Sequence, residues 1–283
     1  MSLHGMSSRN SIVSARALRN ILLYAVLTLS MIPFMFPFLW MILTSLKSEK
    51  DIWSIPPKLI FSPTLINYEY VLRNFKFPQY FLNSLVIGLG AGLLGLALGL
   101  PAAFSIARYR QKGVAFLVLL ARIIPGMSLL LPWYVIFTYL GLSDTYFALI
   151  LTHLAITLPL TIWIMIGFFE EVPRELEDAA LIDGCSLSGV FRRVALPICV
   201  PGIVVSFLLG FAFSWNNFLL SAVVGGPQTR TLPVIAYMQI GMYRTEWGAM
   251  PTTGILITLP VLIMTLFIQR YIIRGLAFGA IKG

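Results

Sequence analysis

Apolar residues dominate the chain in long uncharged runs, and short polar segments separate these runs. A helix needs roughly 20 residues to cross the hydrocarbon core of a bilayer, and the runs are long enough to do so. The pattern predicts one membrane-spanning helix in each of six ranges: residues 20–46, 79–107, 114–140, 145–169, 198–223 and 247–268. We therefore expect an all-α polytopic membrane protein with six transmembrane helices, formed by residues 20–283 as one transmembrane domain.

Composition supports a membrane protein and excludes an ordinary soluble domain. Hydrophobic residues make up 58% of the chain and charged residues 11%, whereas a soluble domain carries roughly 25% charge. The net charge of +9 is spread over the polar segments between the predicted helices, so it does not indicate a nucleic-acid partner. The only histidines are His4 and His153, and they give no spacing typical of a zinc site.

The charge distribution also predicts an orientation. Six helices place both ends of the chain on one side, and most of the 20 Lys and Arg residues fall on that side. The positive-inside rule makes this side cytoplasmic. Residues 1–19 are polar and basic and are expected to form a mobile cytoplasmic tail. The run 20–46 exceeds the apolar core of a secretory signal, about 7–15 residues, so we expect it to be retained as a span.

The charged segment 170–197 interrupts the apolar pattern between the fourth and fifth predicted helices. Its internal signals indicate two short helices joined by a turn. Asp183-Gly184 is typical of a helix end, because glycine tolerates the left-handed conformation there. The second helix is expected to be capped by Ser186 or Ser188 and to end before Pro197.

One motif in this segment resembles a known family. Asp178-Ala179-Ala180, three residues, Gly184, nine residues and then Val194-Ala195-Leu196-Pro197 resemble the EAA loop of importer-type ABC transporter permeases. The usual pattern has Glu in place of Asp178 and Ile in place of Val194, and the spacing is kept. The resemblance implies a type I ABC importer transmembrane domain whose cytoplasmic loop docks into a separate ATPase. It assigns this coupling role to Glu177, Asp178, Ala179, Ala180, Asp183, Gly184, Leu196 and Pro197.

Other stretches are similar to the carbohydrate-importing branch of that family, the maltose and glycerol-phosphate permease type. They are Thr44-Ser45-Leu46-Lys47, Tyr80-Phe81-Leu82-Asn83-Ser84-Leu85, Trp215-Asn216-Asn217-Phe218 and the terminal run from Arg274 to Gly283, in which Phe278 replaces a more usual small residue. This likeness implies that the solute is a sugar or sugar derivative. It also implies two ATPase subunits, an extracytoplasmic solute-binding protein and a second permease, which is either a copy of this chain or, as the likeness favours, a different chain.

The chain itself lacks the means to hydrolyse ATP. It has no Gly-Lys dipeptide and hence no phosphate-binding P-loop. We expect no enzyme activity, no catalytic residue, no metal and no cofactor in this chain, with ATP and Mg bound by the partner ATPase. The resemblance places the protein in a bacterial or archaeal cell membrane. The polar connections 47–76 and 225–246 are expected to receive the binding protein.

Two features mark candidate residues for the solute pathway. Arg122 is the only charge inside any predicted span, so it should face the bundle, a wet cavity or a structural partner. The fifth predicted span carries a continuous stripe of small and polar residues that either lines a cavity or packs on another helix, with Asn216 beside it: Ser206, Gly210, Ser214, Asn217 and Ser221. His153, Thr157 and Thr161 share one helix face, where a structural role for His153 is favoured.

Glycines in the second predicted span are spaced for close helix packing. Gly88 and Gly92, and then Gly95 and Gly99, form two Gly-x-x-x-Gly pairs. The formal GxGxxG match that begins at Gly90 lies inside an apolar helix with no preceding strand, so we reject a dinucleotide site.

Two other classes of protein fit the sequence less well. A secondary transporter usually carries ionisable relays within the membrane, but no Asp or Glu lies in a predicted span. A membrane-embedded enzyme would need a catalytic motif, and neither HExxH nor a nucleophile elbow is present. Within the importer class, the alternative solute is another small molecule, such as a polyamine, a phosphate ester or a metal complex.

Overall fold

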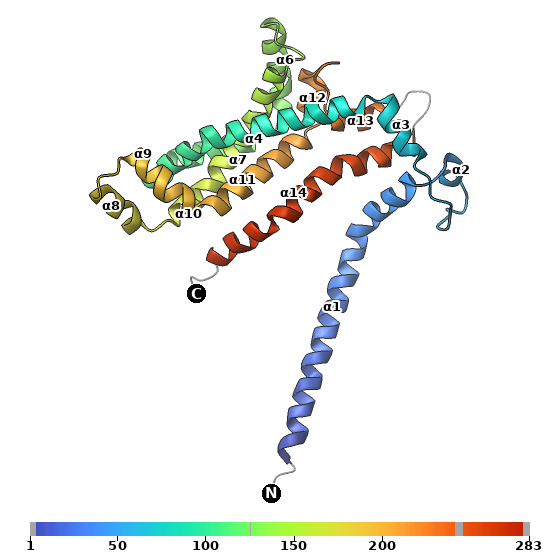
Figure 1. Cartoon of the computed structure of the whole chain (residues 1–283), viewed down its shortest axis with the longest axis horizontal. Coiled ribbons are helices and arrows are strands. Elements are labelled where there is room, and N and C mark those ends of the chain that lie inside the picture. The colour runs from blue at the N-terminus through green and yellow to red at the C-terminus, as the bar shows by residue number, and fades with distance from the viewer. Residues whose placement is uncertain (1–3, 125, 241–245, 280–283) are drawn as a thin grey trace. The chain divides into compact units, whose positions relative to one another are not determined.

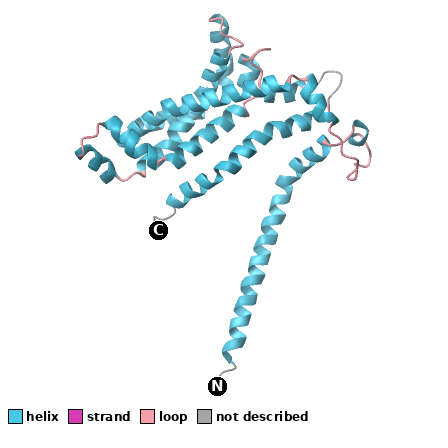
Figure 2. Ribbon diagram, viewed as in Figure 1, coloured by secondary structure: helices cyan, strands magenta, loops and turns pink. Residues whose placement is uncertain are grey.

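The computed structural model describes residues 4–124, 126–240 and 246–279, and these residues fold into helices joined by short connections (Figure 1). Figure 2 shows that the described part of the chain contains no strand. The predicted all-helical fold is therefore confirmed. Four described helices are long and apolar enough to cross a membrane: Arg19–Ser45, Phe77–Arg108, Tyr146–Glu170 and Ala249–Leu266.

Two further candidate spans are broken. One consists of Lys112–Ile123 and Gly126–Tyr139, and the other of Leu187–Ile198 and Val200–Trp215, so up to six spans are present if each pair counts as one. Pro125, between the two parts of the first pair, lies outside the described residues. The third predicted helix, 114–140, is thus divided into α5 (Lys112–Ile123), the 3₁₀ turn η1 (Gly126–Leu129) and α6 (Leu130–Tyr139).

The fifth predicted helix is also divided, which corrects the expectation of one continuous helix over 198–223. α11 (Val200–Trp215) ends at Asn216, and α12 (Leu219–Val224) begins after Phe218. The reason is local. Asn217 Oδ1 accepts a hydrogen bond from Leu220 N at 3.0 Å, so the amide satisfies an N–H at the start of a new helix.

The chain divides into two compact units, Met1–Tyr68 with Trp247–Ile255 and Glu69–Glu246 with Leu256–Gly283. The first unit contains α1 (His4–Ser45), α2 (Glu49–Ile52) and the start of α3 (Ile66–Asn74). α1 begins at His4, so residues 4–19 of the predicted cytoplasmic tail are helical, and the expectation that this tail is mobile stays a prediction. Residues 4–32 contain no proline, and nothing interrupts the helix there.

The connection after α1 is held to the end of that helix. Asn67 Nδ2 donates to Ser45 O at 2.9 Å and to Lys47 O at 2.8 Å. Lys47 is buried, and its ammonium nitrogen lies 4.9 Å from the centroid of the Trp40 ring. This cation–π contact places a charge against an aromatic face, which offsets part of the cost of burial.

Helix packing in the second unit depends on the predicted glycines. α4 (Phe77–Arg108), α7 (Tyr146–Glu170) and α11 lie side by side (Figure 1). A Cβ atom on Gly88 would lie 2.8 Å from the Phe211 ring of α11, and one on Gly99 would lie 2.9 Å from Thr161 of α7. The Gly-x-x-x-Gly pairs therefore allow α4 to approach both neighbours, as predicted.

The described residues also form α8 (Arg174–Ile182), α9 (Leu187–Val190), the π turn η2 (Phe191–Ala195), α10 (Leu196–Ile198), α13 (Leu232–Met238) and α14 (Ala249–Gly279).

Candidate functional site

The segment 170–197 forms the predicted helical hairpin. α8 ends at Asp183, and Gly184 has φ of +86°, a conformation that glycine adopts without strain. Ser186 caps the next helix, because its Oγ accepts a hydrogen bond from Gly189 N at 3.2 Å. Ser188 Oγ instead lies 3.0 Å from Ser186 Oγ. Of the two predicted caps, Ser186 is therefore the one that the structure contains.

The second helix of the hairpin continues past Pro197, contrary to the expectation that it would end before this residue. In the π turn η2, Leu196 N bonds to Phe191 O, five residues back. This shift of register lets the helix pass through Pro197, which has no N–H to donate, as the short α10. The chain then bends at Cys199, and the axes of Leu187–Ile198 and α11 meet at 79°.

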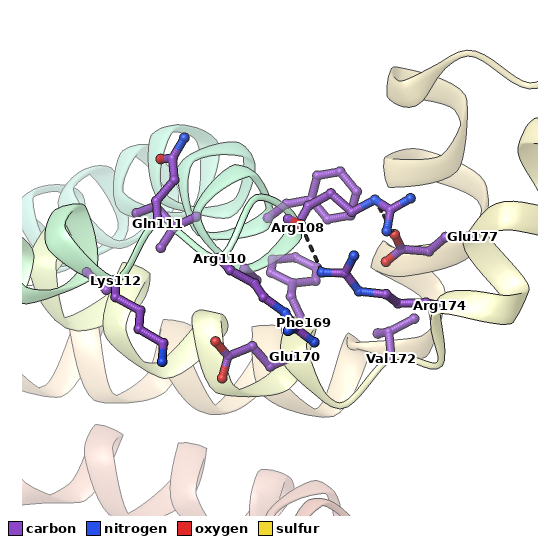
Figure 3. Close-up of a pocket in the computed structure, with 13 residues that line it drawn as sticks. Arg108, Arg110, Gln111, Lys112, Phe169, Glu170, Val172, Arg174 and Glu177 are labelled. Atoms are coloured by element: carbon purple, nitrogen blue, oxygen red, sulfur yellow. Dashed lines mark hydrogen bonds and ion pairs between the residues drawn. The ribbon is translucent and has the colours of Figure 1, made fainter.

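Arg108, at the end of α4, fixes the hairpin to the core (Figure 3). Its Nε lies 2.9 Å from Glu177 Oε2, and its Nη2 lies 3.0 Å from Asp178 Oδ1. The Glu177 side chain is only 5% exposed and that of Arg108 15%, so this ion pair is shielded from solvent. Arg174 Nη2 donates to Arg108 O at 3.0 Å and makes a third link between α8 and α4.

Arg108, Arg174 and Glu177 line a cavity of about 370 Å³ between the ends of α4 and α7 and the start of α8 (Figure 3). Its rim is rich in charge and includes Arg110, Lys112 and Glu170. Next to it, the Phe191 ring of η2 packs against Phe104 of α4 and Phe169 of α7, at centroid distances of 5.2 and 6.2 Å. The hairpin is therefore joined to two core helices by both ion pairs and aromatic contacts.

The outer face of the hairpin is exposed and partly apolar. Ile182 is 86% exposed, Leu176 48% and Leu187 47%, and the small side chain of Ala179 is exposed between them. Exposed apolar residues grouped in this way are typical of a surface that binds another protein. Of the other predicted coupling residues, Asp178, Asp183, Gly184 and Pro197 are exposed, Ala180 and Leu196 are half-buried, and Glu177 is buried.

Some residues of the predicted polar stripe are buried between helices, and others lie at an open surface. Ser214 and Ser221 are buried, and both lie at the same imidazole: His153 Nδ1 is 2.7 Å from Ser214 Oγ, and His153 Nε2 is 3.3 Å from Ser221 Oγ. His153 of α7 thus joins α11 to α12 across the break between them. This agrees with the structural role favoured for His153, and it gives the two serines a partner within the chain.

Residues 215–218 make the break between α11 and α12. Trp215 is buried, and its Nε1 donates to Ile257 O at 3.0 Å. Asn216 is exposed and Asn217 half-buried. Both line an open hollow together with Ala212, Phe213, Phe218 and Leu219.

Arg122, near the end of α5, lies beside this hollow. The central carbon of its guanidinium is 5.9 Å from the centroid of Phe213, a ring that lines the hollow. The Arg122 side chain is exposed, and no ion pair joins it to any described residue. A charge at mid-membrane costs about 2.5–3.5 kcal/mol on insertion scales, and a cation–π contact offsets only about 0.5–2 kcal/mol.

Sequence reasoning did not identify the residues that organise the connection after α12. The Asp144 carboxylate accepts hydrogen bonds from Gly226 N at 2.9 Å, Gln228 N at 3.1 Å, and the N and Oγ1 of Thr229 at 2.9 and 2.7 Å. Partial burial raises the pKa of Asp144, but the hydrogen bonds from Thr229, Gln228 and Gly226 outweigh it and leave the pKa below 3.8. The only sequence signal was an acidic residue directly before a predicted span, at 145–169.

Asn83 and Ser84 hold the same connection from α4. Asn83 Nδ2 donates to Gln228 O at 2.8 Å and to Arg230 O at 2.9 Å, and Ser84 Oγ accepts from Leu232 N at 2.8 Å. These two residues belong to the stretch Tyr80–Leu85 that the sequence analysis singled out only for its resemblance. Within the described residues, no group of three or more His, Cys, Asp or Glu could hold a metal ion.

The fold and site together define a polytopic membrane protein with an exposed helical hairpin fixed to its core. The family described as "Binding-protein-dependent transport system inner membrane component" matches residues 95–278. The chain therefore belongs to this family of inner membrane transport components.

Named relatives span nearly the same length. The trehalose/maltose transport system permease protein MalG of Thermococcus litoralis is 33% identical over 94% of this chain and 98% of its own. The trehalose transport system permease protein SugB of Mycobacterium tuberculosis is 34% identical, over 87% and 92%. A crystal structure of a bacterial ABC transporter involved in import of the acidic polysaccharide alginate matches with a TM-score of 0.74 at 17% identity, over 91% of this chain and 97% of that one, which supports the fold.

Proposed function

We propose that the protein is the membrane-spanning permease subunit of an ATP-driven importer, and that its solute is a sugar or sugar derivative. The observation that carries this proposal is the hairpin of α8 and α9, exposed on one face and fixed by Arg108 on the other. Its sequence has the EAA spacing, and relatives that match most of the chain are named for trehalose and maltose transport.

The hairpin acts as the lever between a separate ATPase and the membrane. The exposed residues Leu176, Ala179 and Ile182 enter a groove on the ATPase, and closure of the ATPase dimer moves the hairpin. The Arg108 ion pairs and the Phe191 contacts pass this movement to α4 and α7. The rigid turn through η2 and α10 passes it to α11, whose far end carries the hollow.

The solute pathway runs along the break between α11 and α12. Asn216 and Asn217 offer amide groups at the hollow, and Arg122 stands at its edge. Ser214 and Ser221 contribute indirectly, because their hydroxyls are engaged with His153 and hold the two half-helices together. Alternating access then requires the half-helices to tilt rather than to unfold.

The assembly requires further chains. We infer two ATPase subunits that bind ATP and Mg, a second and different permease, and an extracytoplasmic binding protein that docks on the connections 47–76 and 225–246. Both termini face the cytoplasm, which agrees with the excess of Lys and Arg on that side. The membrane is the bacterial or archaeal cell membrane, and this chain performs no catalysis.

Two alternatives stay open to experiment. The first is import of another small solute, such as a polyamine, a phosphate ester or a metal complex, by the same machinery. The second is secondary transport, which the absence of Asp and Glu from the predicted spans disfavours.

Purification of the tagged chain from its native membranes in mild detergent tests the assembly. We expect mass spectrometry to recover a P-loop ATPase and a second polytopic protein in stoichiometric amounts. A lone chain that survives gentle extraction and still transports solute, driven by an ion gradient, would contradict the proposal.

A further inference from the structure

Arg122 is the one charged group of the predicted spans, and its position is unusual. It follows Lys112, the first residue of α5, by ten positions, which is about 15 Å along a helix and half the thickness of the hydrocarbon core. No Asp or Glu lies in any predicted span, so this chain offers no carboxylate at the same depth. Among the described residues, Arg122 contacts an aromatic ring and forms no ion pair.

The groups beside Arg122 are those that bind a saccharide. Phe213 and Phe218 present aromatic rings at the hollow, and rings of this kind pack against the apolar faces of sugars. Asn216 Nδ2 donates to Ala212 O, and Asn217 Oδ1 accepts from Leu220 N. Asn216 Oδ1 therefore remains able to accept a hydrogen bond from a sugar hydroxyl, and Asn217 Nδ2 remains able to donate one.

Arg122 adds a charge preference to this set. A guanidinium is planar and always protonated, and it binds a carboxylate or sulfonate through two parallel hydrogen bonds. A neutral sugar would leave this charge without a counter-charge, and a cationic solute would be repelled by it. An acidic group on the solute satisfies it.

We propose that the solute is an anionic saccharide whose carboxylate or sulfonate binds Arg122 during passage, while its ring contacts Phe213 and the amides of Asn216 and Asn217. This inference rests on the proposed function, since it names the chemical class of the solute within that function.

The test uses the complete purified importer in proteoliposomes, with ATP inside and its binding protein outside. The probe is an equimolar mixture of neutral saccharides (maltose, trehalose and cellobiose) and acidic ones (digalacturonate, a sulfonated glycoside and a uronate-containing disaccharide), and mass spectrometry measures uptake of each. We expect ATP-dependent uptake of an acidic member. Arg122→Gln should lower this uptake at least about tenfold, because it removes both the charge and the two parallel hydrogen bonds that bind the acidic group of the solute.

Two variants serve as controls. Arg19→Gln removes the same charge from an exposed residue at the start of the candidate span Arg19–Ser45, and it should leave uptake within about twofold of the unaltered importer, because a single exposed charge contributes little. Arg122→Lys keeps the charge but loses the two parallel hydrogen bonds, so it should retain part of the acidic uptake. The yield of the assembled complex and its basal ATPase rate report whether each variant folds. If Arg122→Gln does not assemble, the uptake of acidic and neutral saccharides by Arg122→Lys is compared with that of the unaltered importer instead.

Three results would overturn the inference. Uptake of neutral saccharides alone would do so while leaving the proposed function in place. An equal loss of neutral and acidic uptake in Arg122→Gln or Arg122→Lys would show that Arg122 acts only on structure. ATP-dependent uptake of no saccharide at all would contradict the proposed function, and the inference would fall with it.

Discussion

At the scale of single residues, the connection after α12 depends on a carboxylate surrounded by donors. Asp144 accepts four hydrogen bonds from Gly226, Gln228 and Thr229, and its own backbone has φ of +57°. Aspartate tolerates this left-handed conformation better than most residues. One side chain therefore orders a segment that lies more than 80 residues away in sequence, on a surface we propose as a docking site.

Gly226 is required because a side chain there has no room. A Cβ atom would lie 2.6 Å from both Cγ and Oδ2 of Asp144, and the carboxylate cannot turn away without breaking its hydrogen bonds. We expect Gly226→Ala to destabilise the protein by about 1–3 kcal/mol, as overpacking does. Thermal unfolding of the purified complex measures it. Gly167→Ala is the matched control, since nothing lies within 4 Å of its Cβ position; equal midpoints for the two variants would contradict the account.

The pKa of Asp144 makes this contribution depend on pH. Because the pKa in the folded protein lies below the usual 3.8, the stabilisation is fully present above that value and is lost as the pH falls through the lowered pKa. Asp144→Asn should therefore unfold at a lower temperature than the unaltered protein at pH 6. The difference between the two unfolding temperatures should narrow only below pH 3.8. A gap that closes already between pH 7 and pH 5 would assign the effect to another group.

At the scale of elements, the hairpin is held by a shielded ion pair. Arg108→Gln would leave the buried Glu177 carboxylate without its counter-charge, and loss of one partner from such a pair costs about 3–5 kcal/mol. We expect a cost near the lower end, because Arg108 is partly exposed. Faster hydrogen exchange across α8 would report it directly.

Two variants show whether the buried ion pair between Arg108 and Glu177 causes the loss of stability. Adding Glu177→Gln to Arg108→Gln should restore part of the lost stability, because the unpaired charge is gone. Asp178→Asn should cost less than about 1 kcal/mol, because the Asp178 side chain is 59% exposed. A large effect of Asp178→Asn, with none from Arg108→Gln, would reverse our assignment.

Local signals predicted the elements well wherever a single residue decides the backbone. Gly184 indicated the turn of the hairpin, Ser186 or Ser188 indicated its cap, and the glycines of α4 indicated close packing. The π turn was not predictable, since Phe191–Ala195 contains nothing unfavourable to an ordinary helix. The break at Asn217 was missed because the side-chain amide of an asparagine in a membrane helix can bond either to a neighbouring helix or to the backbone at a nearby helix start. Tertiary contacts decide between these two bonds.

The candidate sites were predicted only in part, because their contacts join distant segments. Sequence alone identified Arg122 as an exceptional charge, but not its position over Phe213. It assigned Ser214 and Ser221 to the pathway, whereas the structure shows both hydroxyls at His153. Arg108 and Asp144 each act on residues about 70 to 85 positions away, a separation at which no periodic pattern gives a signal.

At the scale of the whole molecule, we propose that movement passes from the hairpin to the hollow. The hairpin's inner face is bound to α4 and α7, its outer face is exposed, and its end turns through 79° into α11. Only the outer face is open to a partner, and there Ala179 lets another surface approach the backbone closely.

The most direct measurement compares ATP hydrolysis and solute uptake in the reconstituted importer with and without Ala179→Arg. Ala179 is exposed, whereas Ala180 is half-buried, so an arginine at 179 blocks docking without disturbing the hairpin itself. We expect Ala179→Arg to insert normally into the membrane, but to lose uptake and the stimulation of ATP hydrolysis by solute-loaded binding protein. Uptake and stimulated hydrolysis at the level of the unaltered importer would contradict the role of the hairpin as the coupling element.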